Sequence, residues 1–240
     1  MSNFFKIYYA TPNKNETGYV SHQIEMSSVQ ENYDYTHSNS YRKTYFDKKI
    51  NYEVIFPIFE LVRGAKLTDL MNYSGGGSYS CIIISLKFLS ILKKFKIDDY
   101  QTFEIKIRTS SGLKDYIMFF MYALERDQKY IDWTQTTFRI KPYMGELEKD
   151  QLIKIENYES FWKFRMELFN KPKQVEEIKL TNLELKKEII IEDMFKFSGT
   201  SSGFFVSEAL KNEIEKQDIT GIRFRDADGL REPSYSPEMD

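Results

Sequence analysis

The sequence predicts an α+β protein built as a single domain, in which helices pack on a mixed β-sheet. The first observation behind this prediction is an internal repetition. Residues 81–107 and 203–225 each hold an apolar strand-like run, a serine, an amphipathic helical segment, an isoleucine and a second alternating run. Aligning Ser85 with Ser207 also brings the apolar positions of the two helical segments into register. Because a serine hydroxyl can accept a bond from an early helix N–H, we expect two similar strand–Ser–helix–strand units.

Composition and length are the other two observations. Of the 240 residues, 41% are hydrophobic and 16% are aromatic, which is ample material for a core. A chain of this size buries roughly 70% of its unfolded surface on folding. No shift in composition marks a domain boundary. Residues 1–225 are therefore expected to form one domain, and residues 226–240 a loose C-terminal tail.

Apolar patterning is sparse before the first unit. Residues 4–9 alternate and predict a strand. Residues 54–62 are apolar but contain Pro57, which cannot donate a ladder hydrogen bond and therefore indicates an edge strand or an extended connector. Residues 66–71 are expected to form a short helix or turn, and the glycines at 75–77 a flexible loop into the first unit.

The patterning becomes stronger from the first unit onward. Apolar residues recur along residues 86–95 at helical spacing and predict a core-facing helix. Residues 116–124 are apolar on both faces, which favours a central strand. A helix is expected at residues 158–170, and one or two strands at residues 178–191.

Charge and cysteine content narrow the class of protein. With 34 basic and 36 acidic residues the formal net charge is −2, which argues against an electrostatic nucleic-acid binder. Cys81 is the only cysteine, so no intrachain disulfide forms, as suits a reducing compartment. The start of the sequence lacks a signal-peptide pattern, and the longest apolar run, 117–124, is far shorter than the ~20 residues that span a bilayer. A soluble cytoplasmic protein is expected.

Residue types for catalysis and metal binding are scarce. His22 and His37 are the only histidines, and nothing in their spacing sets either one beside a nucleophile and an orienting acid. One cysteine and two distant histidines cannot supply a zinc ligand set. The glycines at 75–77 lack the lysine and Ser/Thr of a phosphate loop. We therefore assign no catalytic residue, no metal site and no cofactor, and expect a binding protein rather than an enzyme.

Two local motifs admit a binding role. Residues 42–49 interleave basic residues with aromatic ones. Such a combination can bind nucleic acid, because the basic groups neutralise phosphates and the rings stack on bases. The interpretation that we favour is a hydrated, partly packed loop. In the pair Asp132-Trp133, the tryptophan is of a type enriched in binding hot spots. A buried Trp beside a capping Asp is the competing interpretation, and we favour it.

A succession of short motifs spans residues 52–225, most of the chain. The motifs lie at residues 57–61, 64–69, 83–85 with the helix that follows, 116–120, 131–133 with Phe138, 195–197, 205–210 and 219–224. Each motif is short, but their order is more specific than any one of them. This succession resembles a family of bacterial immunity proteins of polymorphic toxin systems, formerly catalogued as a domain of unknown function.

The resemblance implies a cytoplasmic protein that binds a cognate toxin encoded nearby and neutralises it by occluding its active surface. It supplies no catalytic residue. Among the matched positions, it implies that the two serines cap helices, that the glycine lies in a tight turn and that the tryptophan lies in the core. The matched positions are Lys66, Asp69, Ser85, Tyr116, Asp132, Trp133, Phe205, Ser207, Gly221 and Phe224.

The toxin-facing surface is expected in the unmatched parts of the chain, where exposed aromatic and acidic side chains provide contact area and charge complementarity. The residues expected there are Tyr33, Tyr35, Tyr41, Tyr45, Asp98 and Asp99, with Glu146, Glu148 and Asp150 as further acidic candidates. Two alternatives stay open. One is a small cytoplasmic enzyme that uses acidic residues, and the other is a nucleic-acid-binding accessory protein that uses residues 42–49.

Overall fold

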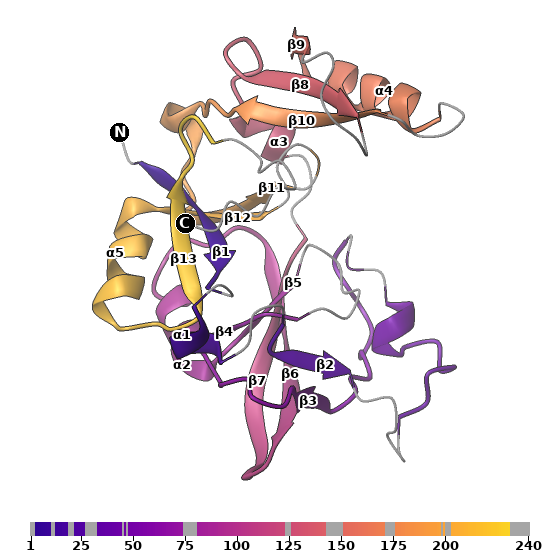
Figure 1. Cartoon of the computed structure of the whole chain (residues 1–240), viewed down its shortest axis with the longest axis vertical. Helices are drawn as coiled ribbons and strands as arrows, with labels where there is room; N and C mark the ends of the chain where they lie inside the picture. The colour runs from indigo at the N-terminus through magenta and orange to yellow at the C-terminus, as the bar shows by residue number, and fades with distance from the viewer. Residues whose placement is uncertain are drawn as a thin grey trace.

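The strands of the described residues form three sheets, and helices cover them in an α+β arrangement, the class that the sequence predicts (Figure 1). The computed structural model describes residues 3–10, 13–18, 22–26, 33–44, 46, 48–73, 81–122, 126–142, 151–170, 176–197, 199 and 203–230. Within these ranges, no helix is long and apolar enough to cross a membrane.

The N-terminal strand lies inside a sheet that is otherwise built from the C-terminal part of the chain. The sheet order is β11-β12-β1-β13, and every neighbouring pair is antiparallel. Its strands are β1 (Phe4–Tyr9), β11 (Met194–Phe197), β12 (Gly203–Ser207) and β13 (Ile222–Asp226). Helix α5 (Glu208–Lys216) connects β12 to β13 and packs on β1 and β12.

The second sheet has six strands in the order β2-β3-β6-β7-β5-β4. Its β3–β6 pair is parallel and its other pairs are antiparallel. Its strands are β2 (Ile24–Met26), β3 (Phe59–Leu61), β4 (Leu70–Met71), β5 (Cys81–Ile84), β6 (Tyr100–Thr109) and β7 (Gly112–Met121). Helix α2 (Leu86–Leu92) connects β5 to β6. The central strand predicted at 116–124 is the interior strand β7.

The two repeated units have the same strand order. The order β4-β5-β7-β6 in one sheet matches β11-β12-β1-β13 in the other, and in each unit the helix runs from the second strand to the fourth. An antiparallel strand separates the two strands that the helix joins, so each unit is a split βαβ. That strand is β7 in the first unit, where it follows β6, whereas in the second unit it is β1 at the start of the chain. The two units therefore share one spatial arrangement of strands, and the order of these strands along the chain differs by a circular permutation.

Serine caps the helix of each unit, as the sequence predicts. Ser85 Oγ accepts the N–H of Phe88 at 3.0 Å, and Ser207 Oγ accepts the N–H of Leu210 at 3.2 Å. These bonds satisfy helix-start donors that would otherwise lack a partner.

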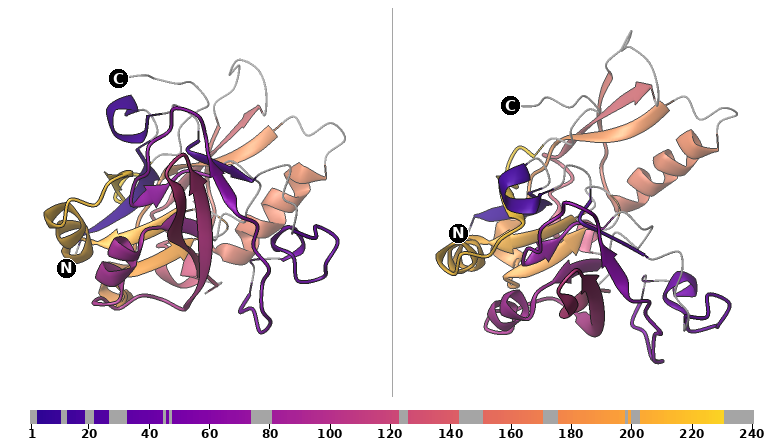
Figure 2. Two further views of the ribbon diagram at one scale, coloured as in Figure 1. Left: turned by 90° about the horizontal axis from the view of Figure 1, so that it is seen from below. Right: turned by 60° about the horizontal axis from the view of Figure 1, so that its bottom comes forward.

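The third sheet belongs to a group of elements that we call the outer module, at the top of Figure 1. Its members are α3 (Arg126–Tyr130), β8 (Thr137–Pro142), β9 (Gln151–Lys154), α4 (Tyr158–Phe169) and β10 (Glu176–Asn182). The sheet order is β10-β8-β9, and α4 confirms the helix expected at residues 158–170. Figure 2 shows that α4 and α5 lie on opposite sides of the molecule. Three shorter helical segments complete the description, namely α1 (Lys14–Thr17), η1 (Tyr41–Lys43) and η2 (Lys187–Ile189).

A central apolar core joins the two units. It forms where the inner faces of both sheets meet α2 and α5, and it includes Phe88, Phe119, Val206, Leu210 and Ile214, all at most 1% exposed. Neither unit could bury its own sheet face and helix alone, which explains why the two units pack as a pair.

Each sheet has a second buried face with its own core. The outer face of the β1 sheet carries Phe195 and Phe205, which pack against the outer module. The outer face of the six-stranded sheet is covered by residues from the segment 33–56, including Tyr41 and Phe46. The two units therefore form the centre of the molecule, and each is covered on its far side.

Three expectations about local structure are wrong. Residues 66–71 are not a helix or turn, because Leu70–Met71 pair with β5 as strand β4. Of the two alternatives for residues 54–62, the edge strand is wrong, because strand β3 begins after Pro57 and lies in the sheet interior between β2 and β6. Residues 226–230 are not a loose tail, since Ala227 and Leu230 are buried in the outer-module core. Residues 231–240 and the glycines at 75–77 lie outside the described residues.

Candidate functional site

The matched residues Asp69 and Ser85 lie at a joint between the two units. Asp69 Oδ1 accepts the hydroxyl of Ser85 at 2.6 Å, while its Oδ2 accepts both the N–H and the hydroxyl of Thr220 at 2.9 Å. Thr220 follows α5 in the other unit. One carboxylate thereby fixes the helix cap of its own unit to the loop of the neighbouring unit.

An equivalent joint forms around Asp193. Its Oδ1 accepts the hydroxyl of Ser207 at 2.7 Å, and its Oδ2 accepts the N–H of Lys96, which follows α2 in the first unit, at 3.0 Å. Asp193 is half-buried and is not among the residues singled out from the sequence. The signal that identifies it is an Asp followed by apolar residues ahead of each capping serine, since Asp69 precedes Leu70 as Asp193 precedes Met194.

Other matched residues also build this frame. Tyr116 donates its hydroxyl to the Thr68 carbonyl at 2.9 Å, and burial, with a contribution from the Asp69 charge, raises the pKa of Tyr116 to about 12. Gly221 has φ +82°, and a Cβ there would lie 2.2 Å from the Leu70 carbonyl oxygen, so the expected tight turn needs glycine.

The last matched residues divide between core and surface. Phe205 is fully buried, and Phe224 packs at the edge of the central core. Lys66 is exposed and donates to the Asn15 carbonyl at 2.9 Å. Trp133 is 5% exposed, which confirms its place in the core. Asp132 caps the turn after it by accepting the N–H and hydroxyl of Thr134 at 3.0 and 2.7 Å.

The tyrosines expected to face a toxin mostly build a core instead. Tyr33 and Tyr41 are 7% and 4% exposed, so the interpretation of both as exposed aromatics is wrong. Tyr35 is half-buried, with its ring centre 4.6 Å from that of Tyr33 and the Arg42 guanidinium 4.9 Å from its ring. Tyr45 lies outside the described residues. The physical reason is that the outer face of the six-stranded sheet requires an apolar cover, and this segment supplies it.

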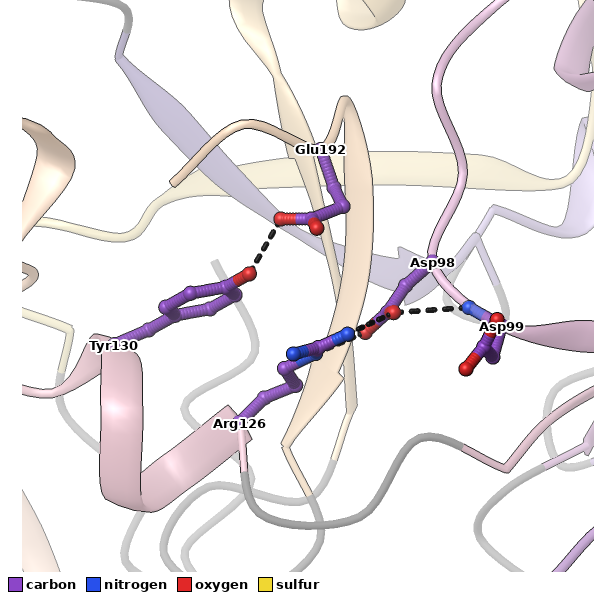
Figure 3. A network of polar contacts seen from close by, with 5 residues as sticks. All are labelled: Asp98, Asp99, Arg126, Tyr130 and Glu192. Atoms are coloured by element: carbon purple, nitrogen blue, oxygen red, sulfur yellow. Dashed lines mark hydrogen bonds and ion pairs between the residues drawn. The ribbon is translucent and has the colours of Figure 1, made fainter. Parts of the chain in front are cut away.

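Of the acidic residues expected on that surface, one is buried and one is exposed among those that the structure describes. Asp98 is 4% exposed and forms a two-pronged ion pair with Arg126, while its Oδ1 also accepts the N–H of Asp99 at 2.9 Å (Figure 3). Only Asp99 of the two is exposed. In the same network, Tyr130 donates to Glu192. Glu146, Glu148 and Asp150 lie outside the described residues.

The network in Figure 3 has an architectural role. Arg126 and Tyr130 both come from α3, Asp98 follows α2, and Glu192 precedes β11. Hydrogen bonding to Asp98 raises the pKa of Arg126, and burial raises the pKa of Tyr130, so both donors keep their protons at neutral pH. The network therefore attaches the outer module to segments of both units.

The basic and aromatic stretch at residues 42–49 does not present its described rings to solvent. Phe46 is 4% exposed, and Arg42 lies against Tyr35. Lys43 donates to a main-chain carbonyl, that of Thr36. Among the described residues of this stretch, no aromatic ring is free to stack on a base.

A hollow of about 400 Å³, lined mostly by residues of polar types, lies where the turn after α3 meets the start of α4. We call it the acidic hollow. Its lining residues come from three separate segments and are Gln128, Asp132, Trp133, Thr134, Glu156, Asn157, Tyr158, Glu159 and Lys186. Of the nine, the sequence identified only Asp132 and Trp133, because the others are brought there by the packing of the outer module.

A second hollow, of about 230 Å³, is mainly apolar and lies between the two sheets. Its walls include Tyr9, Leu70, Cys81 and Phe204. Burial raises the pKa of the Cys81 thiol, so this cysteine is not a thiolate at neutral pH. Across the described ranges of the chain, no group of His, Cys, Asp and Glu residues is arranged to hold a metal ion.

No protein-family model matches the chain, and no curated protein matches it. The fold and its two joints define an α+β protein of two permuted split-βαβ units, and its candidate site is the acidic hollow.

Proposed function

We propose that this chain is a non-enzymatic immunity protein that acts in the cytoplasm, binds a cognate toxin domain and neutralises it by occluding the toxin's active surface. The toxin would be encoded by a neighbouring gene. No cofactor and no membrane take part in this function.

The observation that supports the proposal is the position of the matched residues in the fold. Asp69, Ser85, Ser207 and Gly221 lie at the joints between the units, and Trp133 lies in the outer-module core. A family that shares one frame and adapts its surface to different toxins would place its common motifs in such positions. The unmatched surface then remains available for a partner.

The nucleic-acid alternative receives less support. It depended on the stretch 42–49, whose Phe46 ring is buried, and on a basic surplus that a net charge of −2 does not provide. An enzyme that uses acidic residues would need carboxylates free to act on a substrate, and two buried or positioned ones are engaged already: Asp98 by Arg126 and Asp132 by Thr134.

The proposal is tested by co-expression. The C-terminal domain of the upstream gene product is expressed in a heterologous bacterium with and without this protein, and surviving cells are counted. We expect the domain to be toxic, the protein to restore growth, and the two to co-purify. The affinity should be nanomolar or better, or ~−12 kcal/mol, over an interface of roughly 1,600 Å² in total.

Two controls make the result specific. A toxin from an unrelated system should not be neutralised, because recognition depends on one complementary surface. Incubation with purified toxin should yield a stoichiometric complex with no chemical change in the toxin, as mass spectrometry of both chains would show. A toxic domain that this protein neither rescues nor binds would overturn the proposal.

A further inference from the structure

Among the residues that the structure describes, the acidic hollow is lined by more carboxylates than cationic groups. Three carboxylates, those of Asp132, Glu156 and Glu159, line it against the single ammonium group of Lys186. Glu156 and Glu159 are exposed, and neither has an ion-pair partner among the residues that the structure describes. The hollow is therefore negative overall, which disfavours an anionic ligand and favours a cationic one.

The third carboxylate is fixed in place. Asp132 accepts two hydrogen bonds from Thr134, and these bonds, with the charge of Lys186, hold its pKa below the usual range. Asp132 therefore stays ionised at neutral pH, and its position does not depend on a ligand.

The wall beside these carboxylates is aromatic. The ring centres of Trp133 and Tyr158 are 6.2 Å apart in an edge-on arrangement, and both residues line the hollow. Aromatic faces attract cations. The Trp133 indole N–H is buried, and no described residue accepts its hydrogen bond. The wall therefore adds aromatic contact area beside the carboxylates.

We propose that the acidic hollow receives a lysine or arginine side chain of the bound toxin. This inference rests on the proposed function. The carboxylates of Glu156 and Glu159 take the positive charge, and the aromatic wall packs against the aliphatic stem. A basic amino-acid side chain of a protein brings both the charge and the aliphatic stem.

The residues of the hollow select this occupant over a metal ion. Within the described ranges, its carboxylates do not form a group that could hold a metal. Divalent cations such as Ca²⁺ and Mg²⁺ need several oxygen ligands at about 2.0–2.6 Å. A long side chain with a charged tip can instead meet separate carboxylates and use a hollow of about 400 Å³.

The test uses a charge-neutral variant with a matched control. The hollow variant is Glu156→Gln with Glu159→Gln, and the control is Glu53→Gln with Glu167→Gln. Both control positions are exposed, carry the same charge change, and lie outside the hollow. Thermal melts of both variants should stay close to that of the unmodified protein, because surface substitutions of this kind alter stability little.

Binding of each protein to the toxin domain of the upstream gene product is then measured at low and physiological salt. We expect the hollow variant to bind at least ~10-fold more weakly and to lose part of the salt dependence, whereas the control stays within ~2-fold. Lysine and arginine residues of the toxin are then replaced by alanine one at a time. One of these changes should weaken binding to the unmodified protein but add no further loss with the hollow variant.

The outcomes separate the two proposals. If the unmodified protein neutralises and binds the toxin but the hollow variant binds equally well, the hollow is not the contact and only this inference is overturned. If every toxin substitution adds fully to the loss in the hollow variant, the effect is long-range and the pocket assignment is again wrong. If the unmodified protein does not bind at all, the proposed function and this inference are both overturned.

Discussion

Replacing Asp193 by alanine should separate the helix cap of one unit from the loop of the other. The substitution removes two hydrogen bonds to an ionised carboxylate, from the Ser207 hydroxyl at 2.7 Å and from the Lys96 N–H at 3.0 Å. Such bonds are worth about 1.5–3 kcal/mol each. Because Asp193 is half-buried, both bonds belong at the lower end of this range, and we expect a loss of about 3 kcal/mol in the free energy of unfolding.

For a chain of this size, a loss of about 3 kcal/mol corresponds to a Tm lower by roughly 6–12 °C. Urea denaturation followed by circular dichroism would measure the free energy, and a thermal melt the Tm. Asp69→Ala should have a similar effect, since Asp69 occupies the equivalent joint and accepts bonds from Ser85 and Thr220.

The matched control is Asp228→Ala, which removes a carboxylate from an exposed ion pair with Lys187. Exposed pairs contribute about 0–1 kcal/mol, so this variant should melt close to the unmodified protein. A loss below about 1 kcal/mol for Asp193→Ala, or one no larger than that of Asp228→Ala, would refute the idea that these carboxylates hold the units together.

Two further outcomes concern buried aromatic residues. Trp133→Ala should cost about 3–5 kcal/mol by opening a cavity beside Phe138 and Phe161, and unchanged denaturation would show that the indole is not part of that core. Tyr116→Phe should make stability fall less steeply above pH 10. The folded-state pKa is raised to about 12, so the stability linked to the protonated phenol is complete below the unfolded-state pKa and is lost as the pH rises toward 12. An equal alkaline slope in both proteins, from pH titration of the unfolding midpoint, would contradict this.

The repetition around Ser85 and Ser207 shows how much local patterning can predict. A strand, a capping serine, an amphipathic helix and a second strand are specified by neighbouring residues, and both units form as expected. The strand that separates the two helix-linked strands of each unit could not be predicted from the sequence. In the first unit it is β7, which follows β6 directly, but in the second unit it is β1, far away in the chain. Which strands pair in a sheet depends on contacts between segments that are distant in the chain. The local hydrophobic periodicity of a strand carries no information about those contacts.

The candidate site likewise contains some residues that the sequence singles out and others that it does not. Asp132 and Trp133 stand out as a pair in the sequence, and the burial of the indole follows from its size and hydrophobicity. Glu156, Glu159 and Lys186 carry no local signal, since isolated charged residues occur throughout this chain. Only the packing of α4 against the turn after α3 makes them neighbours.

Exposure is where sequence and structure differ most. Tyr33, Tyr41 and Asp98 lie in polar stretches and are expected at the surface, yet all three are buried. The two tyrosines cover a sheet face that would otherwise contact water, and Asp98 tolerates burial because Arg126 compensates its charge. The sequence by itself determined the fold class, the two capped units and the buried tryptophan, since these depend on periodicity and residue type. The tertiary structure alone decided the joints, the buried ion pair and the acidic hollow, because each needs groups that are distant in the chain to meet in space.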